Sequence, residues 1–155
     1  MNKLPAYKIF PLGDAALTVD FGNTISPVIN DQVISLFKKL QEWPINGMSE
    51  AIPTYSSLTI YYDLYHLRIK GTQEKTVFEE IKKRVINFLE QEKGIYPYKN
   101  RVFSIPVCYE KEFAKDLEWA TDHLKITAGE FIRFHTAKSY RVYMLGFLPG
   151  FPYLG

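Results

Sequence analysis

The sequence predicts an α+β fold, a small α/β sandwich in which helices pack on one face of a mostly antiparallel sheet. Two observations lead to this fold class. Short segments alternate apolar with polar residues, which is typical of half-buried strands, and two longer segments repeat apolar residues at helical spacing. Their order along the first two-thirds of the chain is strand, strand, helix, strand, helix, strand.

The first two strands are predicted to form a hairpin. Residues 7–12 are a largely apolar run that ends at Gly13-Asp14, a pair that favours turns. Apolar residues then alternate with polar ones over residues 17–21. We therefore expect an antiparallel pair that turns at Gly13-Asp14.

A helix is predicted to follow, with Ser26 as its cap and Pro27 in its first turn. Pro44 and Gly47 end this region. The apolar positions that repeat at helical spacing are Ile29, Val33, Leu36, Phe37 and Leu40. A single strand is then expected over residues 52–63.

The second helix has the clearest pattern in the chain. Thr72 is its expected cap, and Gly94 is expected to end it. Its apolar stripe consists of Val77, Ile81, Val85 and Phe88. Two ion pairs are predicted on its outer face, Glu79 with Lys83 and Glu80 with Arg84.

We place a domain boundary near residues 98–101, which separates an N-terminal domain of residues 1–98 from a second part of residues 99–155. The second part buries too little apolar surface to offset chain entropy alone. It is therefore expected to lean on the first domain or to open a larger one.

Four elements are predicted in the second part. They are a strand over Arg101–Val107, helices over Phe113–Leu124 and Ala128–His135, and a strand over Tyr140–Phe147. Thr127 and Glu130 stand at the spacing of a capping box before the second of these helices.

Charge and composition exclude several classes of partner. The chain has 19 Lys and Arg against 17 Asp and Glu, without a basic stripe, so no nucleic-acid partner is predicted. No run approaches the roughly 20 apolar residues of a membrane span, and the N-terminus does not look like a signal peptide. The single cysteine, Cys108, is expected to be a buried, inert thiol rather than a nucleophile. A cytoplasmic protein without membrane partners is expected.

Aromatic residues make up 15% of the chain, with 11 Tyr, 11 Phe and 2 Trp. Excess tyrosine is typical of interfaces and ligand clefts, because one ring both packs and hydrogen-bonds. A compositional bias of the host explains the same numbers equally well, so the composition leaves the two interpretations open.

Few residues are candidates for acid–base chemistry. The three histidines are widely separated, and motifs for a metal, a nucleotide or a serine nucleophile are missing, so no cofactor is predicted to bind this chain. His135, at the end of a predicted helix, is a candidate proton-transfer residue, although the helix dipole alone favours a histidine there. Glu112 is a second candidate, with an ordinary solvated loop charge as the alternative.

The terminal segment Gly146–Gly155 is the strongest signal for a binding site. Its glycines allow backbone N–H groups to approach a ligand, and such groups can hold a carbonyl or carboxylate oxygen. The candidate substrate-binding residues are Gly146, Phe147, Pro149, Gly150, Phe151 and Tyr153. Only Tyr153 among them can exchange a proton, so an acid or base must come from elsewhere. The alternative is a loop that merely packs between sheets.

Four sequence blocks carry a resemblance to a known family. They are FPLGDAAL at residues 10–17, IPTYSSL at 52–58, IPVCY at 105–109 and YRVYMLGFLPGFPYLG at 140–155. In this order they resemble the allophanate hydrolase subunit 1 family, which includes the B subunit of bacterial 5-oxoprolinase and the Kip-type inhibitor of a sporulation histidine kinase. The resemblance covers nearly the whole chain, and its last block is specific.

The resemblance implies a fold and a function. The α/β N-terminal domain would be followed by a cyclophilin-like β-barrel, of which residues 99–155 are the opening part, so the chain looks like a fragment. Glu110, Lys111 and Ala114 stand where the family usually has glycines, which weakens the carry-over of a tight loop there.

By the same resemblance, the chain belongs to an ATP-dependent 5-oxoprolinase complex, a hydrolase that opens the lactam of 5-oxoproline to glutamate. It would be inactive alone and would bind no nucleotide itself, although the complex uses ATP. Its partners would be the 5-oxoprolinase C subunit, which is allophanate hydrolase subunit 2-like, and a lactam-opening subunit. Inhibition of a histidine kinase and a role related to allophanate or urea carboxylase are alternatives that these motifs do not separate.

Overall fold

The structure is a computed structural model that describes residues 6–69, 71, 74–91 and 101–155. The described residues divide into two compact units. The first contains those before residue 99 together with Val142–Gly155, and the second lies within Lys99–Arg141.

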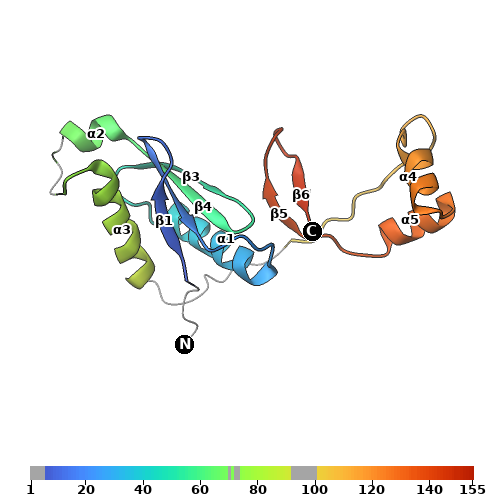
Figure 1. The fold of residues 1–155 in the computed structure, drawn as a ribbon, viewed down its shortest axis with the longest axis horizontal. Helices are drawn as coiled ribbons and strands as arrows, with labels where there is room; N and C mark the ends of the chain where they lie inside the picture. The colour runs from blue at the N-terminus through green and yellow to red at the C-terminus, as the bar shows by residue number, and fades with distance from the viewer. Residues whose placement is uncertain (1–5, 70, 72–73, 92–100) are drawn as a thin grey trace. The chain divides into compact units, whose positions relative to one another are not determined.

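An antiparallel sheet of four strands forms the centre of the first unit (Figure 1). Its strands are β1 (Lys8–Pro11), β2 (Ala16–Asp20), β3 (Met48–Pro53) and β4 (Ser57–Tyr62), in the spatial order β1-β2-β4-β3. The predicted hairpin at Gly13-Asp14 is confirmed: β1 pairs with β2, and Gly13 takes a φ of +63° that glycine adopts without strain.

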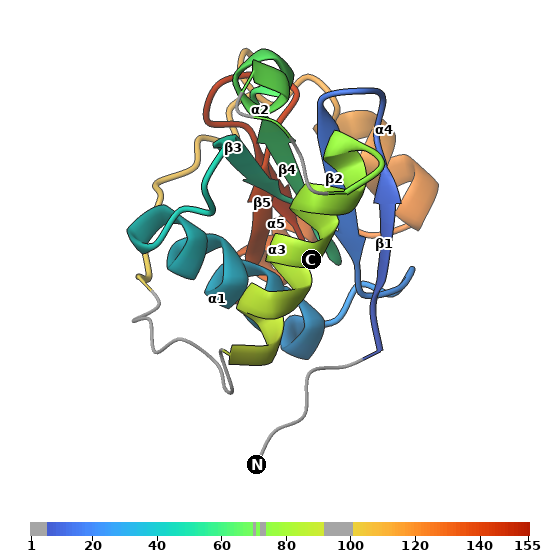
Figure 2. The same cartoon turned by 90° about the vertical axis from the view of Figure 1, so that its left-hand side faces the viewer.

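Two long helices, α1 (Pro27–Glu42) and α3 (Val77–Gln91), lie on the same face of this sheet (Figure 2). The predicted α+β fold, with helices on one face of an antiparallel sheet, is therefore confirmed. The core lies between the layers because β2 and β4 turn alternate side chains toward the helices. Its fully buried members include Leu17, Val19, Val33, Leu40, Leu58, Ile60 and Ile81.

The predicted single strand over residues 52–63 is wrong. Two strands, β3 and β4, form a hairpin there, joined by a turn over residues 54–57. The polar run Thr54-Tyr55-Ser56-Ser57 is what breaks the strand, because Thr54 bonds across it: its N–H donates to the Ser57 carbonyl at 2.8 Å and its Oγ1 accepts from the Ser57 N–H at 3.1 Å. A short helix, α2 (Leu64–Ile69), was not predicted.

The boundaries and pairs of α3 differ in part from those predicted. Thr72 and Gly94 lie outside the described residues, and Thr76 Oγ1 accepts the helix-capping bond from the Glu79 N–H at 3.1 Å. The Glu80–Arg84 ion pair is confirmed at 2.8 Å. Lys83 pairs with Glu74 at 2.6 Å instead of with Glu79, and that hydrogen bond raises the pKa of Lys83.

The second unit contains the helices α4 (Leu117–Leu124) and α5 (Ala128–Thr136). The predicted start of the first helix at Phe113 is wrong, because residues 110–113 form a turn and Asp116 is the N-cap. The capping box of Thr127 and Glu130 is confirmed: the Glu130 N–H donates to Thr127 Oγ1, and the Glu130 carboxylate accepts from the Thr127 N–H. Those bonds lower the pKa of Glu130.

Residues 101–107 do not form the predicted strand. Their apolar alternation is that of a strand, but a strand needs a neighbour for its ladder of hydrogen bonds, and no segment in the described part of the chain pairs with them. For the same reason Cys108 is exposed, which overturns the prediction of a buried thiol.

The terminal segment folds as a hairpin of β5 (Val142–Leu145) and β6 (Pro152–Leu154). The predicted strand over residues 140–147 is thus shorter than expected, and β6 was not predicted. In the part of the chain that the structure describes, the strands form this hairpin and the four-stranded sheet but no closed barrel, so the cyclophilin-like part stays a prediction. No helix among the described residues is long and apolar enough to cross a membrane.

Candidate functional site

The loop that joins β5 to β6 consists of two consecutive tight turns. The Leu148 N–H donates to the Gly146 carbonyl at 2.7 Å, which closes a three-residue turn centred on Phe147. The Phe151 N–H donates to the Leu148 carbonyl at 3.0 Å, and Pro149-Gly150 are the central pair of that turn. Proline followed by a glycine with a φ of +79° is the pattern of a type II turn.

These turns limit which backbone groups can bind a ligand. The N–H groups of Gly146, Leu148 and Phe151 are hydrogen-bonded within the loop, and Pro149 has none. The amides of Phe147 and Gly150 remain as the loop's candidate donors. The predicted use of backbone N–H groups for a carbonyl or carboxylate oxygen is thereby narrowed to two positions.

Phe147 combines two unfavourable features. It has a φ of +61°, a left-handed conformation that is rare for a residue with a bulky side chain. Its ring is also 85% exposed. Neither backbone preference nor burial explains a phenylalanine at this position, and residues held in such conformations concentrate at functional sites.

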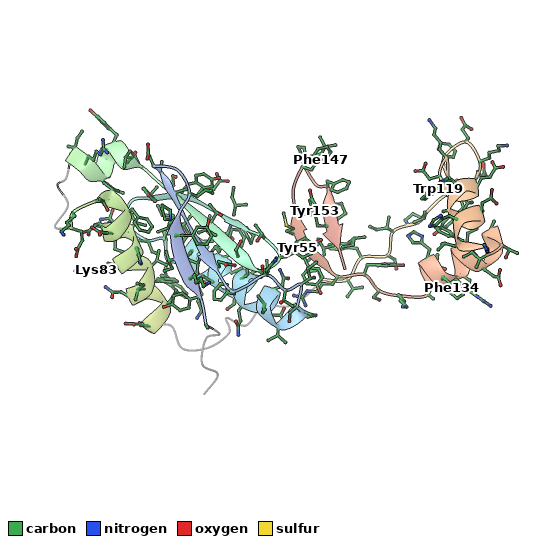
Figure 3. All side chains as sticks on the ribbon, viewed as in Figure 1. Tyr55, Lys83, Trp119, Phe134, Phe147 and Tyr153 are labelled. Carbon is green, nitrogen blue, oxygen red and sulfur yellow. The ribbon has the colours of Figure 1, made fainter. Side chains whose placement is uncertain are left out.

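Five rings form a continuous row from the first unit's sheet to the tip of this hairpin. Tyr143, Tyr55, Tyr153, Phe151 and Phe147 follow one another with ring centroids 5.1, 6.2, 5.5 and 6.1 Å apart. We call these five residues the aromatic row. Figure 3 shows three of its members, Tyr55, Tyr153 and Phe147, in this order from the β3–β4 turn toward the hairpin tip.

Local backbone structure explains how the inner end of the row is held. Tyr55 lies at the centre of the turn that Thr54 braces. The β5–β6 register shifts between Val142 and Met144, and such a bulge re-aims the side chain within it. That side chain is Tyr143, which is 5% exposed and packs on Tyr55. Gly146 fits closely beneath Tyr153, since a Cβ there would lie 3.3 Å from the Tyr153 ring.

The structure thus brings the predicted residues Gly146, Phe147, Gly150, Phe151 and Tyr153 into one compact loop. Sequence reasoning missed Tyr55, Tyr143 and the buried Asn30, whose side chain bonds to both. A signal for Asn30 was present: it occupies the same face of α1 as Val33 and Leu40, where an apolar residue is expected.

His135 and Glu112 belong to the second unit. His135 is surrounded by the rings of Tyr109, Phe131 and Tyr140, and its Nδ1 hydrogen-bonds the Tyr109 hydroxyl. The Tyr140 hydroxyl donates to the His135 carbonyl at 2.9 Å. Glu112 is exposed in a turn. Their proposed roles in proton transfer stay predictions.

A cavity of about 600 Å³ opens elsewhere in the first unit, between the β1–β2 turn, α2 and the start of α3. Asp14, Arg68, Lys75 and the buried Tyr62 contribute to its lining. Burial, and secondarily the charge of Asp14, raise the pKa of Tyr62. Its hydroxyl is therefore a proton donor at neutral pH and not a base.

The raised pKa of Tyr62 predicts a specific alkaline instability. A group with a raised pKa in the folded state contributes stability below its unfolded value, near 10, and loses it as the pH rises through the folded value. The free energy of unfolding, measured with urea from pH 8 to 11, should fall more steeply for the wild type than for Tyr62→Phe. Parallel curves would contradict the assignment.

No group of three or more His, Cys, Asp or Glu side chains among the described residues could hold a metal ion. The candidate site is therefore characterised by aromatic rings and two backbone amides. It can bind an apolar ring that carries a hydrogen-bond acceptor, and its one ionisable member is a tyrosine.

Comparison with known proteins places the chain in a family. The family described as carboxyltransferase domain, subdomain C and D, matches residues 7–155. The chain belongs to this family. Its match contains both the turn that carries Tyr55 and the whole β5–β6 hairpin.

Members of the carboxyltransferase subdomain C and D family with curated names include two 5-oxoprolinase B subunits. The chain is 39% identical to that of Bacillus subtilis (strain 168) and 25% identical to that of Escherichia coli O157:H7, over 96% of its length in both cases. It spans 62% of the length of each. The resemblance found from the four sequence blocks is thus confirmed at the level of the family.

A solved structure also shares this fold. The crystal structure of TTHA0988 superposes with a TM-score of 0.71 at 28% sequence identity, over 90% of this chain and 25% of that one.

Proposed function

We propose that this chain is part of a 5-oxoprolinase B subunit, which acts with partner subunits in the ATP-dependent opening of 5-oxoproline to glutamate. The observation that carries the proposal is the 39% identity, over 96% of the chain, to the Bacillus subtilis protein of that name. A cytoplasmic location belongs to the same proposal.

The β5–β6 loop supports a role in substrate binding. 5-Oxoproline is a small, largely apolar ring that carries a lactam carbonyl and a carboxylate. The rings of Phe147 and Phe151 offer apolar contact to such a molecule, and the amides of Phe147 and Gly150 offer hydrogen bonds to one of its oxygens.

The loop alone offers no general base, because its one ionisable side chain is Tyr153. Proton transfer and the use of ATP are therefore assigned to other groups. In this proposal, His135 and Glu112 are the chain's candidate proton carriers. The partners are the 5-oxoprolinase C subunit, which is allophanate hydrolase subunit 2-like, and a lactam-opening subunit. Inhibition of a histidine kinase stays an untested alternative.

The proposal is tested by reconstitution. The full-length protein is mixed with both partner subunits, 5-oxoproline and ATP, and glutamate release is measured. Turnover is expected in the complete mixture, and loss of turnover is expected when any one of the three proteins is left out. A complete, folded complex that releases no glutamate, or a mixture that is equally active without this protein, would contradict the proposal.

A further inference from the structure

One buried polar side chain connects the sheet of the first unit to the binding loop. Asn30 lies in the second turn of α1 and has no exposed surface. Asparagine is a poor choice for a helix interior, since its amide competes for backbone bonds and gains nothing from an apolar environment. Its presence there indicates that the amide has a task that an aliphatic side chain cannot perform.

The contacts of the Asn30 side chain show what that task is. Its Nδ2 donates to the carbonyls of Thr54 at 3.2 Å, Tyr55 at 3.3 Å and Tyr143 at 3.1 Å. The first two are 24 and 25 residues away in sequence and the third is 113. Three carbonyl oxygens can surround only the amide's NH₂ group, because the amide oxygen would be repelled, so the chemistry fixes its orientation.

These carbonyls belong to the segments that carry the inner end of the aromatic row. Tyr55 and Tyr143 pack ring on ring at 5.1 Å, and Asn30 bonds to the backbone carbonyl of each. The side chain of one helical residue therefore holds the β3–β4 turn and β5 at a fixed separation. An isolated two-stranded hairpin such as β5–β6 is only marginally stable in water, so its order depends on this attachment.

We propose that Asn30 is a positioning residue for the binding loop. Its side-chain amide fastens the β5–β6 hairpin to the turn over residues 54–57 and thereby sets the place of Phe147 and Gly150. The effect on substrate affinity rests on the proposed function, whereas the attachment itself does not.

A general stabilising role for Asn30 makes a different prediction from a positioning role. If Asn30 only stabilises the unit, its loss weakens the sheet and the hairpin together. If it fastens the hairpin, the hairpin loosens while the sheet keeps its protection, because local opening is then cheaper than global unfolding.

The test is hydrogen exchange on the Asn30→Asp variant of the chain, with Thr18→Val as the matched control. The aspartate keeps the shape of the side chain but at neutral pH has no hydrogen to donate. Thr18→Val also removes a hydrogen bond of a buried side chain, the 3.1 Å bond between the hydroxyls of Thr18 and Thr59, at a place without a link to the hairpin.

In Asn30→Asp, the amides of Tyr153 and Gly146 are expected to exchange about tenfold to hundredfold faster, while those of Leu17 and Ile60 change by less than about threefold. In Thr18→Val, the hairpin should keep its wild-type exchange relative to the sheet. Unchanged hairpin exchange in Asn30→Asp, or a parallel increase in sheet and hairpin, would overturn the proposal.

The consequence for function is measured in the reconstituted complex. Asn30→Asp should raise the KM for 5-oxoproline about tenfold and leave kcat within about threefold of the wild type, as expected for loss of binding geometry. A lower kcat at unchanged KM would overturn the link to substrate binding. If the wild-type complex shows no turnover, the proposed function fails, and the exchange experiment still decides whether Asn30 fastens the hairpin.

Discussion

Gly150→Val is expected to lower kcat/KM for 5-oxoproline about a hundredfold in the reconstituted complex. Gly150 has a φ of +79°, which a β-branched residue cannot adopt without strain, and no atom lies within 4 Å of where its Cβ would stand. The effect therefore comes from the backbone alone. When the turn at Pro149-Gly150 changes its path, the Gly150 N–H and the Phe147 ring move away from the substrate, and displacements of about 1 Å suffice for losses of this size.

The matched control for this prediction is Gly150→Asn. Asparagine tolerates the left-handed conformation better than any other residue with a side chain, and the site has room for it. Its kcat/KM should stay within about fivefold of the wild type. Steady-state glutamate release measures both variants. Equal activity of Gly150→Val and the wild type would show that the loop conformation is irrelevant to turnover.

Gly47→Ala is expected to destabilise the first unit by about 2–5 kcal/mol, the sum of two penalties. Gly47 has a φ of +89°, and a Cβ at this position would lie 2.6 Å from Cδ2 of Leu67. Leu67 is only 4% exposed and belongs to the core, so it has little room to move. The alanine thus costs both backbone strain and overpacking against α2.

Gly13→Ala separates these two penalties. Gly13 also has a left-handed φ, +63°, but no atom lies within 4 Å of its hypothetical Cβ. Its loss should be about 1–2 kcal/mol, the backbone term alone. Urea unfolding of both variants gives the comparison through their midpoints. Equal losses would contradict the close packing of α2 against the turn at Gly47.

Local sequence signals predicted the elements that local interactions determine. The hairpin at Gly13, the helix that begins at Pro27 and the capping box of Thr127 and Glu130 all follow from neighbouring residues. The strand predicted over residues 101–107 failed for the opposite reason. Alternation shows that a segment suits a sheet, but only a partner strand makes it one.

The candidate site shows the same division. Glycine and proline marked the loop in the sequence, because they act through the backbone of their own turn. Tyr55 and Asn30 were missed because their parts in the site depend on Tyr143, which is 113 residues from Asn30 in sequence. Phe147 was predicted as a pocket wall, but its left-handed backbone is visible only in the structure.

Affinity for 5-oxoproline tests the central claim most directly. The complex with Phe147→Ala is compared with the wild type by calorimetric titration without ATP. Alanine is subject to the same backbone strain, so the variant removes only the ring that is 85% exposed. If this ring contacts the substrate, the Kd should rise at least about tenfold, the value of burying most of an aromatic side chain. An unchanged Kd would contradict the claim that the β5–β6 loop binds the substrate.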